Sequence, residues 1–140
     1  MTLVGVAQDD VSDAVVLRML AHVLEPDGCR LEVINHSSSA LKLTEAVSEL
    51  EPDLVIVSHL PPTVLTPTRY LVKRLRARRL GQPIVVGHWG SVDEANRANE
   101  QLKAAGATRV VSTIADARER ILECLLPAKS AVTDSIPHPH

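Results

Sequence analysis

The sequence has almost no aromatic residues. Phenylalanine is absent, and Tyr70 and Trp89 are the only tyrosine and tryptophan among 140 residues. Apolar residues nevertheless make up 45% of the chain, which is enough for a packed core. That core must be aliphatic, and many of its Val and Ile residues fall in short runs, a pattern typical of strands buried on both faces.

The sequence is also poor in cysteine, in long apolar runs and in net charge. Cys29 and Cys124 have no CxxC spacing, so we expect two reduced thiols in a cytoplasmic protein. The apolar N-terminal segment lacks the basic region of a signal peptide, and no run approaches the ~20 apolar residues that span a bilayer. A net charge of -2 lacks the basic excess typical of a nucleic-acid-binding domain.

Short apolar runs alternate with segments of helical periodicity. Five strands are expected, at about Leu3–Ala7, Cys29–Ile34, Leu54–Val57, Pro83–Val86 and Thr108–Val111. Helices are expected at about Val11–Leu24, Ala40–Leu50, Thr66–Arg79, Ser91–Ala105 and Ile114–Leu125. Because right-handed crossovers place helices on both faces of a parallel sheet, the alternation predicts an α/β fold. We expect a flavodoxin-like, doubly wound, five-stranded parallel sheet of order 2-1-3-4-5.

The chain is expected to form one domain over residues 1–127. Pro127 should end the last helix, because proline interrupts helical hydrogen bonding. The polar segment 128–140 shows no periodicity and is predicted to be a flexible tail. In the first helix, apolar residues recur at helical spacing at Val15, Val16, Met19, Leu20 and Val23.

Polar residues gather where the predicted strands end. Ligands of open parallel sheets bind outside the carboxyl ends of the strands, so these loops form the predicted cleft. The residues predicted to bind a cofactor or ligand are Asp10, Ser58, His59, Leu60, Gly87, His88, Trp89, Gly90 and Ser112. No metal ligand is predicted, because the histidines at this edge show neither HxxxH nor HExxH spacing. No catalytic residue is predicted either, for the reasons given below for Ser58.

Standard phosphate-binding motifs are missing. The loop after the first strand has neither glycine nor the GxGxxG pattern, and the chain contains no GxxxxGK[ST]. Receiver domains of two-component signalling are a nearer comparison, since Asp9 and Asp10 resemble their acidic pair. However, Ser58 stands where a receiver has its phosphoacceptor aspartate, and Gly87 replaces the Ser or Thr after the fourth strand. We therefore expect no phosphorelay, and a degenerate receiver-like interaction or dimerisation domain remains an alternative.

Cobalamin-binding domains match at two of their three sequence elements. Ser58–Leu60 (SHL) resembles their SxL element, and Gly87–Gly90 (GHWG) lies at the position of their GG element. Their DxHxxG element is absent, because Asp10–Val15 reads DVSDAV and lacks the histidine that ligates cobalt. The resemblance implies a cobalamin-binding-like fold without that ligand. The cofactor still compatible with this resemblance is cobalamin whose own base remains coordinated to the cobalt.

A second resemblance covers nearly the whole domain. It is carried by Ser58–Pro62 (SHLPP), Arg69–Arg78 (RYLVKRLRAR) and Pro83–Gly90 (PIVVGHWG). These stretches are similar to a cytoplasmic C-terminal domain of some permeases of the autoinducer-2 exporter family. That domain is itself cobalamin-binding-like and lacks the cobalt histidine. The resemblance implies a regulatory or sensory module, either free or fused to a transporter.

Several residues have two interpretations. Trp89 can stack on a flat ligand or close the end of the core. Ser58 lacks the G-x-S-x-G elbow of a hydrolase nucleophile, and its neighbour His59 starts on the opposite strand face. Arg69, Lys73 and Arg76 form a basic helix face. This face suits an acidic membrane surface or a membrane-protein partner; in the other interpretation it is only solvated.

The sequence thus predicts a non-catalytic, ligand-sensing or regulatory module that acts in the cytoplasm, with a small-molecule ligand as a candidate partner. A corrinoid-binding domain is the first alternative. A homodimer is also considered, because the helices at Ser91–Ala105 and Ile114–Leu125 offer apolar faces.

Overall fold

A computed structural model describes residues 1–7, 11–35, 40–59, 65–79, 81–90 and 92–135 of the chain. Its centre is a five-stranded sheet made of β1 (Thr2–Ala7), β2 (Arg30–Asn35), β3 (Leu54–His59), β4 (Ile84–His88) and β5 (Arg109–Val111). The strand order is β2-β1-β3-β4-β5, and every adjacent pair is parallel. The predicted flavodoxin-like sheet is confirmed.

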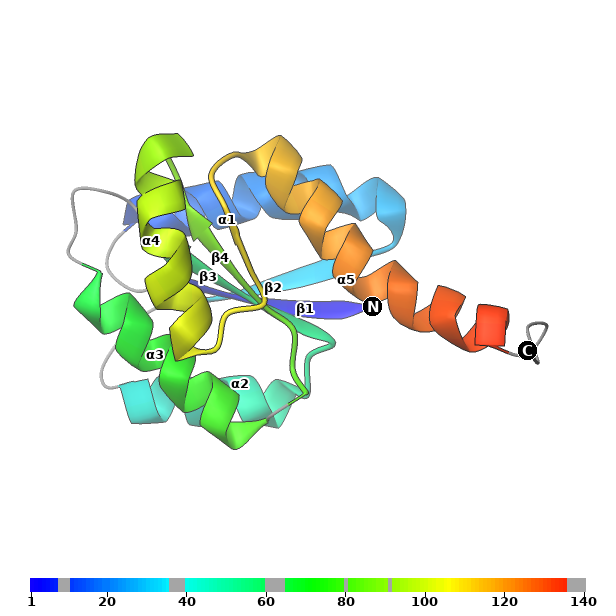
Figure 1. Ribbon diagram of the computed structural model, residues 1–140, viewed down its shortest axis with the longest axis horizontal. Helices are drawn as coiled ribbons and strands as arrows, with labels where there is room; N and C mark the ends of the chain where they lie inside the picture. The colour runs from blue at the N-terminus through cyan, green and yellow to red at the C-terminus, as the bar shows by residue number, and fades with distance from the viewer. Residues whose placement is uncertain (8–10, 36–39, 60–64, 80, 91, 136–140) are drawn as a thin grey trace.

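The helices form a layer on each face of the sheet (Figure 1). They are α1 (Val11–Leu24), α2 (Ala40–Leu50), α3 (Thr66–Arg78), α4 (Val92–Ala105) and α5 (Ile114–Ser135), with a short 3-10 turn at Glu25–Asp27. One hydrophobic cluster joins α1 and α5 to the sheet. A second cluster joins α2, α3 and α4 to the opposite face.

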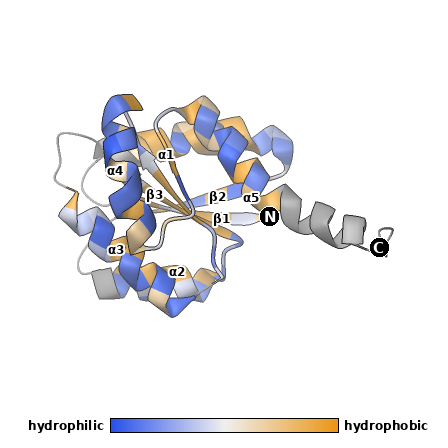
Figure 2. Cartoon of the chain, in the orientation of Figure 1, coloured by the Kyte–Doolittle hydropathy of each residue, from blue (hydrophilic) through white to orange (hydrophobic). Residues whose placement is uncertain are grey.

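Alternation along each strand divides the core between these two layers. In β3, Leu54 and Ile56 pack toward α1 and α5, whereas Val55 and Val57 pack toward α2, α3 and α4. All residues of β3 and β4 are buried, because helices cover both faces of a parallel sheet. In Figure 2, hydrophobic colour marks β3, and hydrophobic and hydrophilic colours alternate along the helices.

The inward face of α1 differs from the apolar spacing read in the sequence. Over Ala14–Leu24, the part of this helix whose burial is described, Ala14, Leu17, Leu20 and Leu24 are buried. By contrast, Val15, Met19 and Val23 are 47%, 53% and 36% exposed. The helix is apolar around much of its circumference, so periodicity alone did not fix which face is buried.

The last helix extends further than predicted. Thr113 caps its start, because the Thr113 hydroxyl accepts a hydrogen bond from the Asp116 N–H at 3.0 Å. The helix passes Pro127 and ends at Ser135, and its C-terminal part projects beyond the sheet (Figure 1). Proline removes one helical donor without forbidding a continuing turn. The proposed domain boundary at residue 127 stays a prediction.

Among the residues described, no helix has both the length and the apolar character needed to cross a bilayer.

Candidate functional site

The parallel register brings the ends of the strands into one row. Ala7 pairs with Ser58, Ser58 pairs with Gly87, and Gly87 pairs with Val111. One residue further along, His59 pairs with His88. Ser58 and His59 continue β3, and Gly87 and His88 continue β4. Both strands are therefore longer than the sequence predicted.

Trp89 closes the α1 and α5 side of this edge. Its indole Nε1–H donates a hydrogen bond of 2.8 Å to the Ser58 hydroxyl, and the residue is only 5% exposed. The ring lies directly over Gly87, where an added Cβ would overlap the six-membered ring of the indole. The absence of a side chain at Gly87 therefore makes room for the chain's own tryptophan.

This geometry favours the second of the two interpretations of Trp89. The ring belongs to the hydrophobic cluster beneath α1 and α5, where it closes the end of the core. Ser58 is 0% exposed, so water and ligands do not reach its hydroxyl in this conformation. A flat ligand that uses Ser58 and Gly87 would first have to displace the indole.

The two imidazoles lie on the other face of the sheet. His59 Nδ1 is 2.8 Å from the Thr68 hydroxyl of α3, and the His59 and His88 rings are 4.8 Å apart between centroids, tilted by 31°. Both histidines and Thr68 are buried, at 3%, 6% and 1% exposure respectively. As expected from strand alternation, Ser58 and His59 face opposite ways and do not form a nucleophile–base pair.

His88 has an unusual electrostatic environment. Burial lowers the pKa of His88, while the dipole of its own backbone and the charge of Glu94 oppose this shift. Within the part of the chain described, its Nδ1 atom has no hydrogen-bond partner. A buried ring nitrogen without a partner is costly, so a ligand or solvent molecule that supplies a partner there would be stabilised.

The remaining predicted residues are less informative. Gly90 has a positive φ of 120°, a conformation that favours glycine, and Ser112 is half-buried after β5. Asp10 and Leu60, together with His36, lie outside the described residues. Among the described residues, no group of three or more His, Cys, Asp or Glu side chains is arranged to hold a metal ion.

Thr68 is a site residue that the sequence analysis missed. It lies on the buried stripe of α3 with Leu71, Val72 and Leu75. The spacing of this stripe identifies Thr68 as an inward-facing polar residue, and such residues usually have a hydrogen-bond partner. Its partner, His59, cannot be read from the sequence, because the contact depends on how α3 packs on β3.

The structure changes the composition of the predicted basic surface. Arg76 donates hydrogen bonds to the Gly106 carbonyl from Nε at 3.0 Å and from Nη2 at 2.7 Å. Its Nη2 also lies 3.3 Å from the Thr108 hydroxyl. Arg76 therefore attaches α3 to the turn between α4 and β5. Arg69 is half-buried, and Lys73 is exposed.

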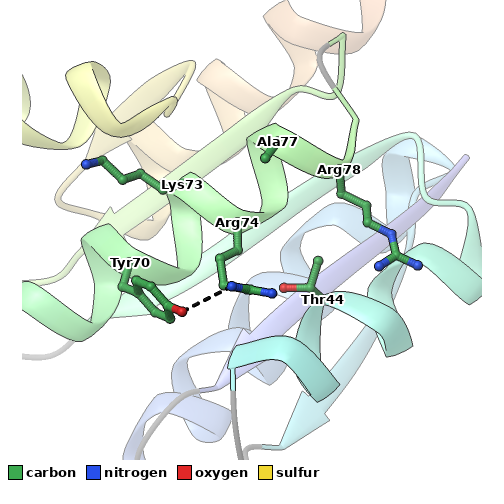
Figure 3. A pocket seen from close by; sticks show the side chains of 6 residues that line it. All are labelled: Thr44, Tyr70, Lys73, Arg74, Ala77 and Arg78. Atoms are coloured by element: carbon green, nitrogen blue, oxygen red, sulfur yellow. Dashed lines mark hydrogen bonds between the residues drawn. The ribbon is translucent and has the colours of Figure 1, made fainter.

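A cavity of about 330 Å³ lies between α2 and α3. Its lining residues are Thr44, Tyr70, Lys73, Arg74, Ala77 and Arg78 (Figure 3). A second cavity of about 450 Å³ lies at the opposite edge of the sheet, before β4. That cavity is lined by residues such as Asp53, Arg79 and Gln82.

No family model and no curated protein sequence matches the chain. The fold, however, is shared with solved structures. A cobalamin-binding protein from Desulfitobacterium hafniense DCB-2 superposes with a TM-score of 0.69 and 18% identity, over 88% of this chain and 58% of that protein. The chain thus spans little more than half of that relative.

Receiver-type structures superpose over more of their own length. A response regulator from Chloroflexus aurantiacus J-10-fl gives a TM-score of 0.64 and 23% identity, over 89% of this chain and 97% of that one. A receiver domain from Clostridium thermocellum gives a TM-score of 0.64 and 18% identity, over 94% and 99%. These likenesses establish a flavodoxin-like fold of the kind used by receivers and cobalamin-binding domains.

Proposed function

We propose that the chain is a non-catalytic regulatory module that senses a ligand at the carboxyl edge of its sheet. The observation that carries this proposal is the hydrogen bond from Trp89 to Ser58 across Gly87. Ser58 stands at the phosphoacceptor position of receiver domains. In this chain its hydroxyl accepts a hydrogen bond from the indole of Trp89.

The edge nevertheless has features of a binding site. Parallel sheets of this kind bind ligands outside their carboxyl ends, and His88 contributes a buried Nδ1 without a partner in the described chain. Trp89 is the element that a ligand would move. Because it is the only tryptophan, its fluorescence reports directly on this edge.

Two measurements test the proposal. The protein is incubated with acetyl phosphate and Mg²⁺, and its intact mass is recorded; we expect no phosphorylated species. Thermal shift and Trp89 emission are then followed with metal ions, nucleotides and corrinoids, and a true ligand should raise the unfolding temperature and change the emission together. Stoichiometric phosphorylation would contradict the non-catalytic assignment.

Cobalamin binding is the second function supported by a specific observation. The SxL-like stretch Ser58–Leu60 begins at the end of β3, and a structural neighbour is described as a cobalamin-binding protein. In this alternative, the corrinoid keeps its own base and takes the space that Trp89 fills.

The corrinoid alternative has a direct test. Wild-type protein and the Trp89→Ala variant are mixed with hydroxocobalamin and desalted, and the visible absorbance is read. A corrinoid site retains colour in the wild type and more in the variant, since the variant opens the space over Gly87. Colourless protein in both cases removes this alternative and leaves the regulatory module with another ligand.

The association with a transporter is part of the proposed role and rests on the sequence resemblance alone. It is tested by co-expressing the chain with a bacterial permease of the autoinducer-2 exporter family that lacks its own C-terminal domain. Co-purification from the membrane fraction is the expected result. Recovery of the chain only from the soluble fraction would contradict it.

A further inference from the structure

The groove between α2 and α3 concentrates positive charge away from the carboxyl edge of the sheet. Lys73, Arg74 and Arg78 line it from α3, and Thr44 lines it from α2. Figure 3 shows the Arg74 and Arg78 side chains extending toward α2, whereas Lys73 extends away along α3. The two guanidinium groups are therefore the cations that face the groove.

Arg74 is held in place by its neighbour Tyr70. Arg74 Nη1 donates a hydrogen bond of 3.1 Å to the Tyr70 hydroxyl, and the guanidinium carbon lies 5.6 Å from the centre of the tyrosine ring. Contact with an aromatic face orients a guanidinium. Orientation before binding reduces the conformational entropy that a ligand must overcome.

The donors of Arg74 are not used up by the protein. Within the described chain, its Nε has no hydrogen-bond partner although it is shielded from solvent. A guanidinium has five N–H donors, and the bond to Tyr70 uses one of them. Arg74 can thus supply further donors to an acceptor bound in the groove.

Carboxylates are absent from the described partners of these cations. None of the ion pairs found in the described residues contains Lys73, Arg74 or Arg78. By contrast, Arg118 and Arg120 on α5 do have carboxylate partners. The groove is consequently a local positive region on a chain whose formal net charge is -2.

We propose that this groove binds a small phosphorylated molecule, with Arg74 and Arg78 as its phosphate ligands. Guanidinium groups match phosphate oxygens in geometry and can bind them with two parallel hydrogen bonds. The volume of about 330 Å³ lies at the lower end of ligand pockets. The exposed ring of Tyr70, at 53% exposure, offers a surface for the organic part of the ligand.

The shape favours a small ligand over an extended polyanion. The cations line a depression between two helices, whereas contact with a nucleic acid backbone uses a broad basic surface. The groove lies on the outer layer of the α2 and α3 face, so the proposal is independent of the ligand sensed at the carboxyl edge. Loss of one site leaves the other intact.

The experiment uses the full chain labelled with ¹⁵N and titrated with pyrophosphate at low salt. Saturable amide shifts confined to α2 and to residues 70–78 of α3 are expected. Arg74→Gln should weaken the affinity by about tenfold or more, since it removes a charge-assisted contact. Lys73→Gln should have a smaller effect, because its side chain points away from the groove.

Arg97→Gln is the matched control. Arg97 is exposed on α4, so this variant changes the net charge equally without touching the groove, and it should bind like the wild type. Equal weakening by Arg97→Gln and Arg74→Gln would overturn the proposal, as would shifts that do not saturate or that spread over the whole surface.

Lipid headgroups also contain phosphate, so a separate experiment distinguishes them from a small phosphorylated ligand. Sedimentation with vesicles of phosphatidylcholine, with and without phosphatidic acid, is measured for the wild type and for Arg74→Gln. Binding to anionic vesicles without saturable binding of pyrophosphate overturns the small-ligand proposal in favour of a membrane surface. Pyrophosphate binding that Arg74→Gln abolishes supports it, whether or not vesicles also bind.

Discussion

At the scale of single residues, Gly87 and Trp89 depend on each other. The glycine could be read from the sequence as a point of close approach by a ligand, but the group that approaches is the indole two residues later. Trp89 directly follows β4, and residues two apart in extended backbone share a face, so the proximity of Gly87 and Trp89 could be read from the sequence. The contact with Ser58 could not be read from the sequence, because Ser58 is a cross-strand neighbour whose position is fixed by the register of β3 and β4.

Replacement of Gly87 by alanine should strongly destabilise the fold. The new methyl group would occupy the space of the Trp89 ring, which must then leave the core and lose its bond to Ser58. We expect a loss of about 3 kcal/mol in the free energy of unfolding, measured by urea denaturation. Gly81→Ala is the control, because an added Cβ there meets nothing within 4 Å. Equal stability of Gly87→Ala and wild type would contradict the packing described.

His88 should make the stability depend on pH. Burial lowers its pKa in the folded state, so the unfolded chain binds its proton at a higher pH than the folded chain does. The stabilisation is complete above the ordinary histidine pKa of about 6.5 and is lost as the pH falls through that value toward the pKa of the folded state. The groups around it are His59 and Glu94.

The measurement is urea denaturation of the wild type and of His88→Gln between pH 7 and pH 5. The free energy of unfolding of the wild type should fall over this interval, and the variant should show a shallower slope. His22→Gln, at an exposed position of α1, should keep the slope of the wild type. A slope that is the same in all three proteins would rule out His88 as its source.

At the scale of secondary structure, the periodicity of the chain predicted each strand and helix, but not always its buried face. In α4, Ala95, Ala98 and Leu102 are buried, so much of the apolar face considered for a homodimer packs against the sheet. Exposed apolar residues include Val15 and Met19 on α1 and Val92 at the start of α4. Sequence periodicity could not separate the two faces of α1, since both are apolar.

Arg76 should be the stabilising arginine of α3. Arg76→Met keeps much of the aliphatic stem but removes the hydrogen bonds to the Gly106 carbonyl and Thr108. We expect a loss of about 2 kcal/mol, measured by urea denaturation. Arg78→Met, at an exposed position on the same helix, should change stability by less than about 0.5 kcal/mol. Equal effects of the two variants would show that the attachment of α3 to the α4–β5 turn contributes nothing.

At the scale of the whole molecule, the order of the sheet followed from the alternation of strands and helices, because crossover handedness leaves few arrangements. The side-chain contacts at the carboxyl edge could not be predicted from this alternation. Whether Ser58, His59 and Trp89 bind a ligand or one another depends on side-chain contacts between elements distant in sequence. The predicted residues are gathered at one edge, but they divide between the two faces of the sheet.

The domain boundary can be tested by truncation. The sequence places the end of the domain at residue 127, and Leu125 is buried on α5 just before it, so a chain ending at residue 127 should retain the fold. Its unfolding temperature should then lie within about 3 °C of that of the full chain. A drop of 10 °C or more, roughly 2 kcal/mol for a domain of this size, would place residues 128–140 within the folding unit.

The closed carboxyl edge is tested most directly by the indole N–H of Trp89. Hydrogen exchange of this proton is followed by NMR in the wild type and in Ser58→Ala, with fluorescence quenching by acrylamide as a parallel measurement. A buried indole bonded to Ser58 should exchange slowly and resist quenching in the wild type, and it should exchange faster in the variant. Exchange and quenching as rapid as those of free tryptophan in the wild type would show that Trp89 lies in solvent, contrary to the structure described.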